Sequence, residues 1–125
     1  MRLKLIGIEG KQLKDYLVVT SKIKDLSQEK LSAMAEKLLK EETKSVKDGI
    51  RRVLIESNLK SVIKIAARYR GAGLTFAALI VAGNAGLIKA VRNFSADETR
   101  PFAEYTAWMI EGVIIDALIE AKREA

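Results

Sequence analysis

Apolar residues recur along most of this chain in steps of three and four. The clearest pattern lies in residues 28–42, where this spacing relates Leu31, Met34, Ala35, Leu38 and Leu39. Such spacing places them on one face of an α-helix. The same pattern predicts further helices over residues 12–21, 45–70, 75–93 and 102–123. We therefore expect an all-α fold, a compact bundle of about five helices in one domain covering residues 1–125.

Residues that cap or end helices stand at the boundaries of these segments. Short polar side chains that can accept a hydrogen bond from the first helical turn are Asp25 or Ser27, Thr43 or Ser45, and Thr75. Gly71 and Gly73 suit the left-handed conformation that ends a helix. Pro101 suits the first helical position, where its missing N–H is harmless. Residues 1–12 precede the bundle, and we expect them to form an N-terminal arm.

Two glycines interrupt an otherwise apolar predicted helix. Gly83 and Gly86 lie inside segment 75–93, and each costs the helix about 1 kcal/mol relative to Ala. Close approach of another backbone usually offsets such a loss. We therefore expect helices 45–70, 75–93 and 102–123 to pack together, with both glycines at a close crossing and the two N-terminal helices laid across them.

The composition excludes several kinds of chemistry. The 125 residues include no Cys and no His, so thiol nucleophiles, disulfides, thiolate zinc sites and histidine bases are excluded. We expect no enzyme activity, no cofactor and no metal site. The longest apolar run, from Leu74 to Ala82 and interrupted by Thr75, is far shorter than the ~20 residues of a membrane span. These features predict a cytoplasmic protein with no membrane partner.

Charge is distributed unevenly along the chain. The net charge is +6, with eight Lys and Arg against two acids in residues 44–70, and five acids against two basic residues in 103–125. A basic segment of this kind suits a polyanionic partner, although it can also be a solvated helix face.

Aromatic residues follow one another in the last predicted helix. Phe102, Tyr105 and Trp108 recur every three residues. Rings at helical spacing usually pack in a core. They can also form a platform on which unpaired bases stack, particularly beside a basic helix that holds the phosphates. The spacing alone leaves both interpretations open.

An ordered series of motifs resembles the sigma-70 family of bacterial RNA polymerase sigma factors. The series reads NLKSVIKIAARYRGAGLTF, then LI..GN.GLIKAV..F, then PF..Y..W.I, and it is similar to region 2 of that family. The segment before it, with DYL at residues 15–17, a capped charged helix and RR.LIE.NL from Arg51, is similar to region 1.2. The resemblance divides the chain into an arm (1–12), a region 1.2-like part (13–52) and a region 2-like part (53–125).

The resemblance implies two partners. In this family, region 2 docks on the clamp helices of the RNA polymerase core, and aromatic residues capture bases of the non-template strand at the promoter −10 element. By position, the implied polymerase-binding residues are Ala78, Leu79, Ile80, Val81, Ala82 and Asn84. The implied DNA-binding residues are Phe102, Tyr105, Trp108, Asn58, Lys60, Arg68 and Arg70.

Several residues depart from the family pattern. Met109 replaces a second Trp, and Glu111, Gly112, Ile115 and Asp116 replace groups that read duplex DNA. Base-edge hydrogen bonds are therefore lost, and acids repel phosphates.

The docking segment departs as well. Ala78, Val81 and Ala82 replace Asp, Gln and Glu. An alternative follows: a sigma-derived interaction protein, acting as a regulator, decoy or self-associating scaffold with little or no promoter binding. Its partner would be a second copy or an anti-sigma protein.

Overall fold

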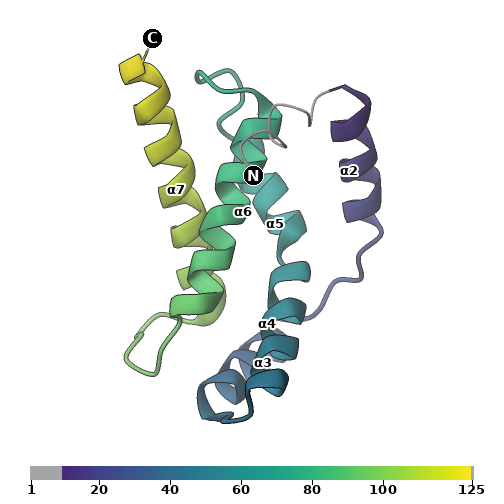
Figure 1. The fold of residues 1–125 in the computed structure, drawn as a ribbon, viewed down its shortest axis with the longest axis vertical. Coiled ribbons are helices and arrows are strands. Elements are labelled where there is room, and N and C mark those ends of the chain that lie inside the picture. Colours follow the sequence, from purple (N-terminus) through teal and green to yellow (C-terminus); the bar gives the residue numbers. More distant parts are fainter. Residues whose placement is uncertain (1–9, 125) are drawn as a thin grey trace.

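A computed structural model describes residues 10–124, in which six helices follow one another (Figure 1). They are α2 (Lys11–Ser21), α3 (Gln28–Lys40), α4 (Lys44–Glu56), α5 (Leu59–Ala67), α6 (Phe76–Asn93) and α7 (Phe102–Glu124). The predicted all-α fold is confirmed. Of the predicted arm, residues 1–9 lie outside the described residues, and Lys11 already begins α2.

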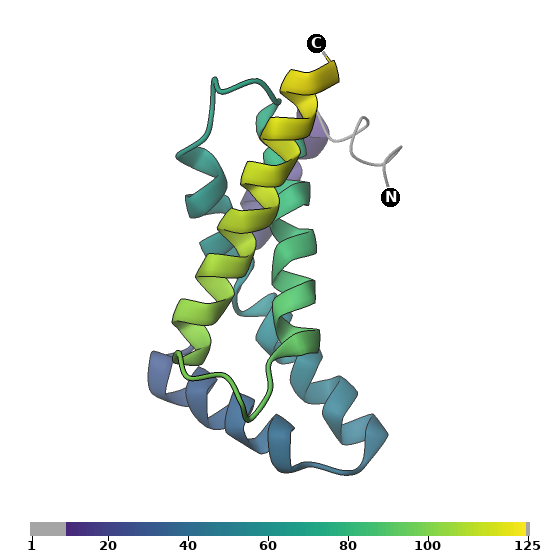
Figure 2. The same ribbon diagram turned by 90° about the vertical axis from the view of Figure 1, so that its left-hand side faces the viewer.

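The three C-terminal helices form the centre of the bundle. Helices α6 and α7 run side by side, and α5 packs against both of them (Figures 1 and 2). Helix α3 lies across the lower end, where it meets α4 and α7, whereas α2 stands alongside α5. The crossing orientation expected for both N-terminal helices therefore describes α3 and not α2. Fully buried side chains at the centre are Leu54, Val62, Leu79, Ile80, Leu87, Ile110 and Ile114.

The predicted helix over 45–70 is wrong in two respects: the helix is interrupted at residues 57–58, and its second part ends at Ala67. Asn58 leaves the helical region with φ −109° and ψ 3°. The Ser57 hydroxyl donates to the Val53 carbonyl at 2.6 Å, and the Asn58 amide donates to the Leu54 carbonyl at 2.7 Å. Side chains of this kind compete with the backbone for helical acceptors. The result is two helices, α4 and α5, in place of one.

The expected capping residues stand at two helix starts. The Ser27 hydroxyl accepts from the Lys30 N–H at 3.2 Å, and the Thr75 hydroxyl accepts from the Ala78 N–H at 3.1 Å. Gly71 adopts φ 84°, in the left-handed region that most side chains avoid. Gly71 therefore lies in the turn after α5, although the helix itself already ends at Ala67.

The close crossing predicted at Gly83 and Gly86 is confirmed. A Cβ atom on Gly86 would lie 2.7 Å from the Met109 carbonyl oxygen and 2.8 Å from the Ile110 Cα. One on Gly83 would lie 2.7 Å from a Val62 methyl group. Because glycine has no side chain, α6 can approach the backbone of α7 and the side chains of α5 at these positions. The approach fixes α7, and with it every aromatic residue of that helix.

None of the helices in the described range is long and apolar enough to span a membrane.

Candidate nucleic-acid interface

Two of the three aromatic residues of α7 are buried. Phe102 is 3% exposed and Tyr105 is 8% exposed. Both contact Phe94, which directly follows α6. The ring centroids are 5.1 Å apart for Phe102, in an edge-to-face arrangement, and 5.6 Å apart for Tyr105. Base stacking by Phe102 or Tyr105 stays a prediction, and it requires this cluster to open.

Trp108 differs from its two neighbours because it lies at the surface. Its side chain is 58% exposed, and its ring centroid lies 6.4 Å from that of Tyr105. The guanidinium carbon of Arg100 lies 4.4 Å from the Trp108 ring centroid and 5.5 Å from the Tyr105 ring centroid. Both distances are those of a cation–π contact.

Glu98 holds this guanidinium in place. The Arg100 Nε donates to the Glu98 carboxylate at 2.8 Å, the Arg100 backbone N–H donates to the same oxygen at 2.9 Å, and Nη2 reaches the second oxygen at 3.4 Å. These hydrogen bonds lower the pKa of Glu98 and raise the pKa of Arg100. Both groups are therefore charged at neutral pH, and the loop between α6 and α7 holds an oriented ion pair beside the exposed indole.

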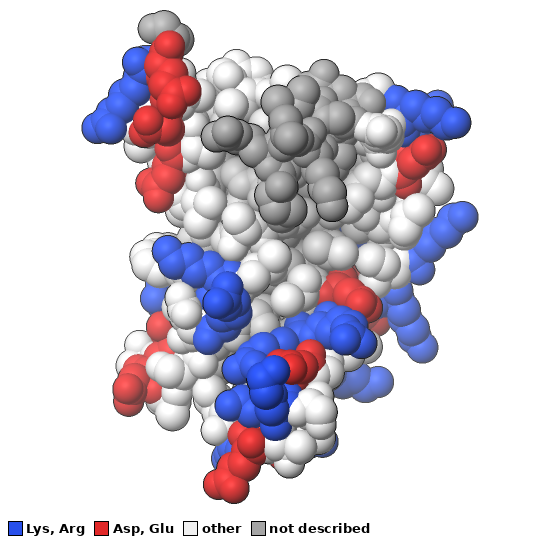
Figure 3. Space-filling model, in the orientation of Figure 1, with Lys and Arg blue, Asp and Glu red and all other residues white. Residues whose placement is uncertain are grey.

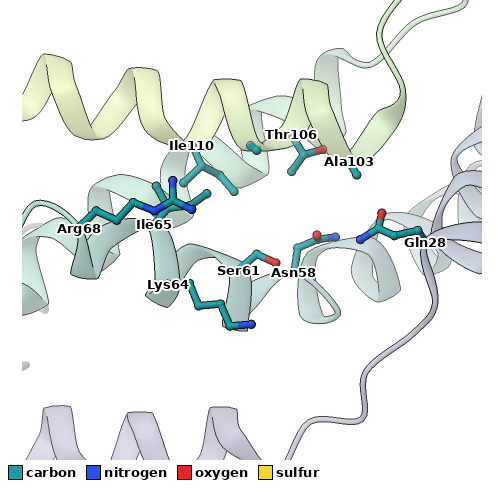
Figure 4. A pocket seen from close by; sticks show the side chains of 10 residues that line it. Gln28, Asn58, Ser61, Lys64, Ile65, Arg68, Ala103, Thr106 and Ile110 are labelled. Carbon is teal, nitrogen blue, oxygen red and sulfur yellow. The ribbon is translucent and has the colours of Figure 1, made fainter.

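A shallow polar groove of about 250 Å³ lies between α5 and α7 (Figure 4). Its walls carry apolar atoms of Ile65 and Ile110 and hydrogen-bonding groups from three helices. The polar lining residues are Gln28, Asn58, Ser61, Lys64, Arg68 and Thr106. Two cations beside neutral donors and acceptors suit the backbone of a single-stranded nucleic acid.

The predicted basic contacts divide into two sets. Asn58 and Arg68 line the groove, although Asn58 is buried and its amide is committed to the break between α4 and α5. Lys60 pairs with Asp25 at 3.2 Å, and the Arg70 guanidinium covers the Phe76 ring at 4.5 Å. The structure therefore places Asn58 and Arg68 along the same groove, whereas Lys60 and Arg70 contact partners outside it.

The predicted polymerase-binding residues lie along α6. Leu79 and Ile80 are buried in the core, at 0% and 2% exposure. Ala78, Val81 and Ala82 are half-buried. Asn84 is also half-buried, and its amide donates to the Tyr16 hydroxyl at 3.2 Å. The exposed residues of α6 are Ala85, Lys89, Arg92 and Asn93, so a partner of α6 would meet basic groups as well as small apolar side chains.

Charged side chains are unevenly distributed on the face drawn in Figure 3. Lys and Arg side chains, with several Asp and Glu side chains among them, gather in its lower half, where α4 lies.

Sequence reasoning missed Lys64, Ser61 and Arg100 as site residues. Residues 58, 61, 64 and 68 follow one another in steps of three and four, so their polar character along one side of α5 was a usable signal. Arg100 precedes the aromatic series by two residues. Because it lies in a loop, helical periodicity could not predict which face of the next helix it contacts.

The sequence comparisons agree with this architecture. Residues 54–124, which contain α5, α6 and α7, match the domain described as Sigma-70 region 2. The match covers more than half of the chain, and the chain belongs to the sigma-70 family.

Named relatives include two proteins called RNA polymerase sigma factor SigA. The protein from Clostridium acetobutylicum is 36% identical over 108 residues, which are 86% of this chain and 27% of the relative. The protein from Bacillus sp is 42% identical over 73 residues, which are 58% of this chain and 19% of the relative. This chain therefore spans about a quarter or less of the length of these two relatives.

Proposed function

We propose that this chain is a transcription initiation domain that binds the RNA polymerase core and the opened non-template strand of the promoter −10 element. Its role is recognition and not catalysis. The observation that carries the proposal is an exposed tryptophan, Trp108, on the same helix that forms one wall of a groove containing Lys64 and Arg68.

On the DNA side, Trp108 offers the surface that an unpaired base requires. A base flipped from a duplex loses a few kcal/mol of stacking, and an aromatic ring can restore part of it. Phe102 and Tyr105 support the ring from the core through their contacts with Phe94. Lys64 and Arg68 would neutralise phosphates of the same strand, which makes the affinity dependent on salt.

On the polymerase side, α6 provides an apolar contact. Half-buried Ala78, Val81 and Ala82 form an apolar part of its surface, and Asn84 supplies a polar group. Leu79 and Ile80 would act indirectly, by holding α6 on the core of this domain. A contact of this composition gains affinity from apolar burial and not from paired charges.

Substitution of Trp108 tests the DNA side. Trp108→Ala should weaken binding to a single-stranded −10 oligonucleotide by about 1–3 kcal/mol, the usual contribution of one base–aromatic stack. Trp108→Phe should retain part of it, because a smaller ring remains. Fluorescence anisotropy of a labelled oligonucleotide measures both.

Ile119→Ala is the matched control. Ile119 is 53% exposed on the same helix and lies three turns from Trp108, so its truncation removes exposed apolar area without removing a ring. Unchanged DNA affinity in Trp108→Ala, combined with a large loss of thermal stability, would assign Trp108 to packing and overturn the proposed stacking.

A further inference from the structure

We propose that Arg100 is a positioning residue for Trp108: Glu98 fixes its guanidinium against one face of the indole, so that the opposite face is held out for a base. The inference rests on the proposed function. It adds one residue, Arg100, which acts on DNA binding through Trp108. It concerns the loop between α6 and α7, where no DNA-binding or polymerase-binding residue was predicted.

The first step is the rigidity of the guanidinium. Three hydrogen bonds join Arg100 to Glu98, at 2.8, 2.9 and 3.4 Å, and one of them comes from the backbone. The side chains are 34% and 16% exposed, respectively. A bidentate arginine–carboxylate pair with a third bond has little rotational freedom, so the guanidinium plane is set before any ligand arrives.

The second step is the position of this plane between two rings. Arg100 lies 5.5 Å from the centroid of buried Tyr105 and 4.4 Å from that of exposed Trp108. Tyr105 belongs to the buried aromatic cluster with Phe94, whereas Trp108 lies at the surface. The guanidinium therefore links an exposed ring to a buried one.

The third step is whether Arg100 supports the Trp108 ring or covers the surface that a base would use. Trp108 remains 58% exposed while Arg100 lies against it, so ring surface is still open to a base. Moving the guanidinium away to make room for a base would break its hydrogen bonds to Glu98. Stacking of a base on the open surface of the ring breaks none of them. Arg100 therefore stays in place when a base stacks.

This role needs the shape of arginine as well as its charge. Lysine carries the same charge but has no planar fork for bidentate pairing and stacking. Replacement by lysine should therefore preserve phosphate attraction and lose the orientation of Trp108. If Arg100 acted through its charge alone, Arg100→Lys would retain both the phosphate attraction and the base stacking.

The test compares two oligonucleotides of about 12 nucleotides: oligo(dA) and an abasic backbone of equal length and charge. The ratio of their affinities isolates base stacking from phosphate attraction. We expect Arg100→Ala and Arg100→Lys each to reduce this ratio about fivefold or more. The control, Arg123→Ala, removes an equal charge at the far end of α7 and should leave the ratio unchanged.

A second readout needs no DNA. The chain contains one Trp, so quenching of its fluorescence by acrylamide reports on Trp108 alone. Quenching should increase in Arg100→Ala, in Arg100→Lys and in Glu98→Gln, while circular dichroism shows an unchanged helical fold.

The outcomes separate the two proposals. A wild-type chain that binds both oligonucleotides equally would refute base stacking and thus the DNA side of the proposed function. A wild-type preference for oligo(dA) that persists in Arg100→Lys would overturn the positioning role alone, because charge would then be sufficient. Unchanged quenching in all three variants would overturn it as well.

Discussion

At the scale of single residues, Glu111 has a structural partner. The sequence suggested only that its charge repels phosphates. In the structure the Tyr69 hydroxyl donates to its carboxylate at 2.7 Å, joining the turn after α5 to the middle of α7. Arg68 approaches the same oxygen at 3.9 Å. Glu111 therefore anchors one end of the groove and also offsets part of the Arg68 charge that faces it.

The Tyr69–Glu111 bond predicts a pH dependence of stability. The hydrogen bond to Glu111, together with burial, raises the pKa of Tyr69 above its usual value of 10.0. A raised pKa means that the contribution to stability is complete below the unfolded-state pKa and is lost as pH rises through the folded-state pKa. Tyr69→Phe should therefore cost about 1 kcal/mol of unfolding free energy near neutral pH, and the difference should shrink above about pH 10.

Urea unfolding of both proteins between neutral and alkaline pH measures this difference. Using the difference cancels the titration of Lys residues, which both proteins share. Parallel stability curves across the whole range would show that the bond does not contribute in solution.

At the scale of elements, the contact between α6 and α7 depends on the absence of a side chain at Gly83 and Gly86. Gly86 faces backbone atoms of Met109 and Ile110, which cannot rotate away. Gly83 faces side-chain atoms of Val62, Ile110 and Ile114, which can shift. The two positions therefore differ in how well they tolerate an added methyl group, although both are buried.

A series of Gly→Ala substitutions tests this difference. Gly86→Ala should destabilise the domain by about 1–3 kcal/mol, because it forces the two helices apart, and should lower the melting temperature by several degrees. Gly83→Ala should cost less. Gly112→Ala is the control: a Cβ there meets no atom of the described residues within 4 Å, so improved helix propensity should stabilise the fold by up to about 1 kcal/mol. Equal melting temperatures for all three variants would contradict the close crossing.

At the scale of the whole molecule, the distribution of surface groups separates two candidate partners. Polar and basic groups line the groove between α5 and α7, and half-buried small side chains lie on α6 beside exposed Lys89 and Arg92. The large exposed apolar residues of the C-terminal helices lie on α7 and not on α6: they are Trp108, Ile115 and Ile119. A docking role for α6 therefore relies on close contact of small side chains.

Retention on RNA polymerase core tests this arrangement. We expect the chain to be retained on immobilised core, and Val81→Asp, which places a buried charge in the apolar contact, to be retained less. Ala96→Asp, in the exposed loop after α6, is the control for added charge. Light scattering on the free chain completes the experiment. A chain that is not retained and that self-associates would support the alternative of a sigma-derived interaction protein.

The pattern of apolar and polar residues determined the helical class of this protein and most of its element boundaries. Helix formation depends on neighbours three and four positions apart, so Ser27, Thr75 and Gly71 could be assigned from the sequence. Gly83 and Gly86 even indicated a close crossing. The break at Asn58 was missed because it depends on side-chain bonds that compete with a strong apolar pattern.

Only the tertiary structure decided which members of the aromatic series are accessible. A helix turns by about 100° per residue, so each step of three falls about 60° short of a full turn, and two steps place Trp108 about 120° from Phe102. The side on which α7 packs was not in the sequence pattern, because it depends on where α6 and Phe94 lie. Packing buried Phe102 and Tyr105, left Trp108 exposed and brought Arg100 against it. The sequence thus determined the helices and the chemistry they carry, and long-range packing determined which of those groups can meet a partner.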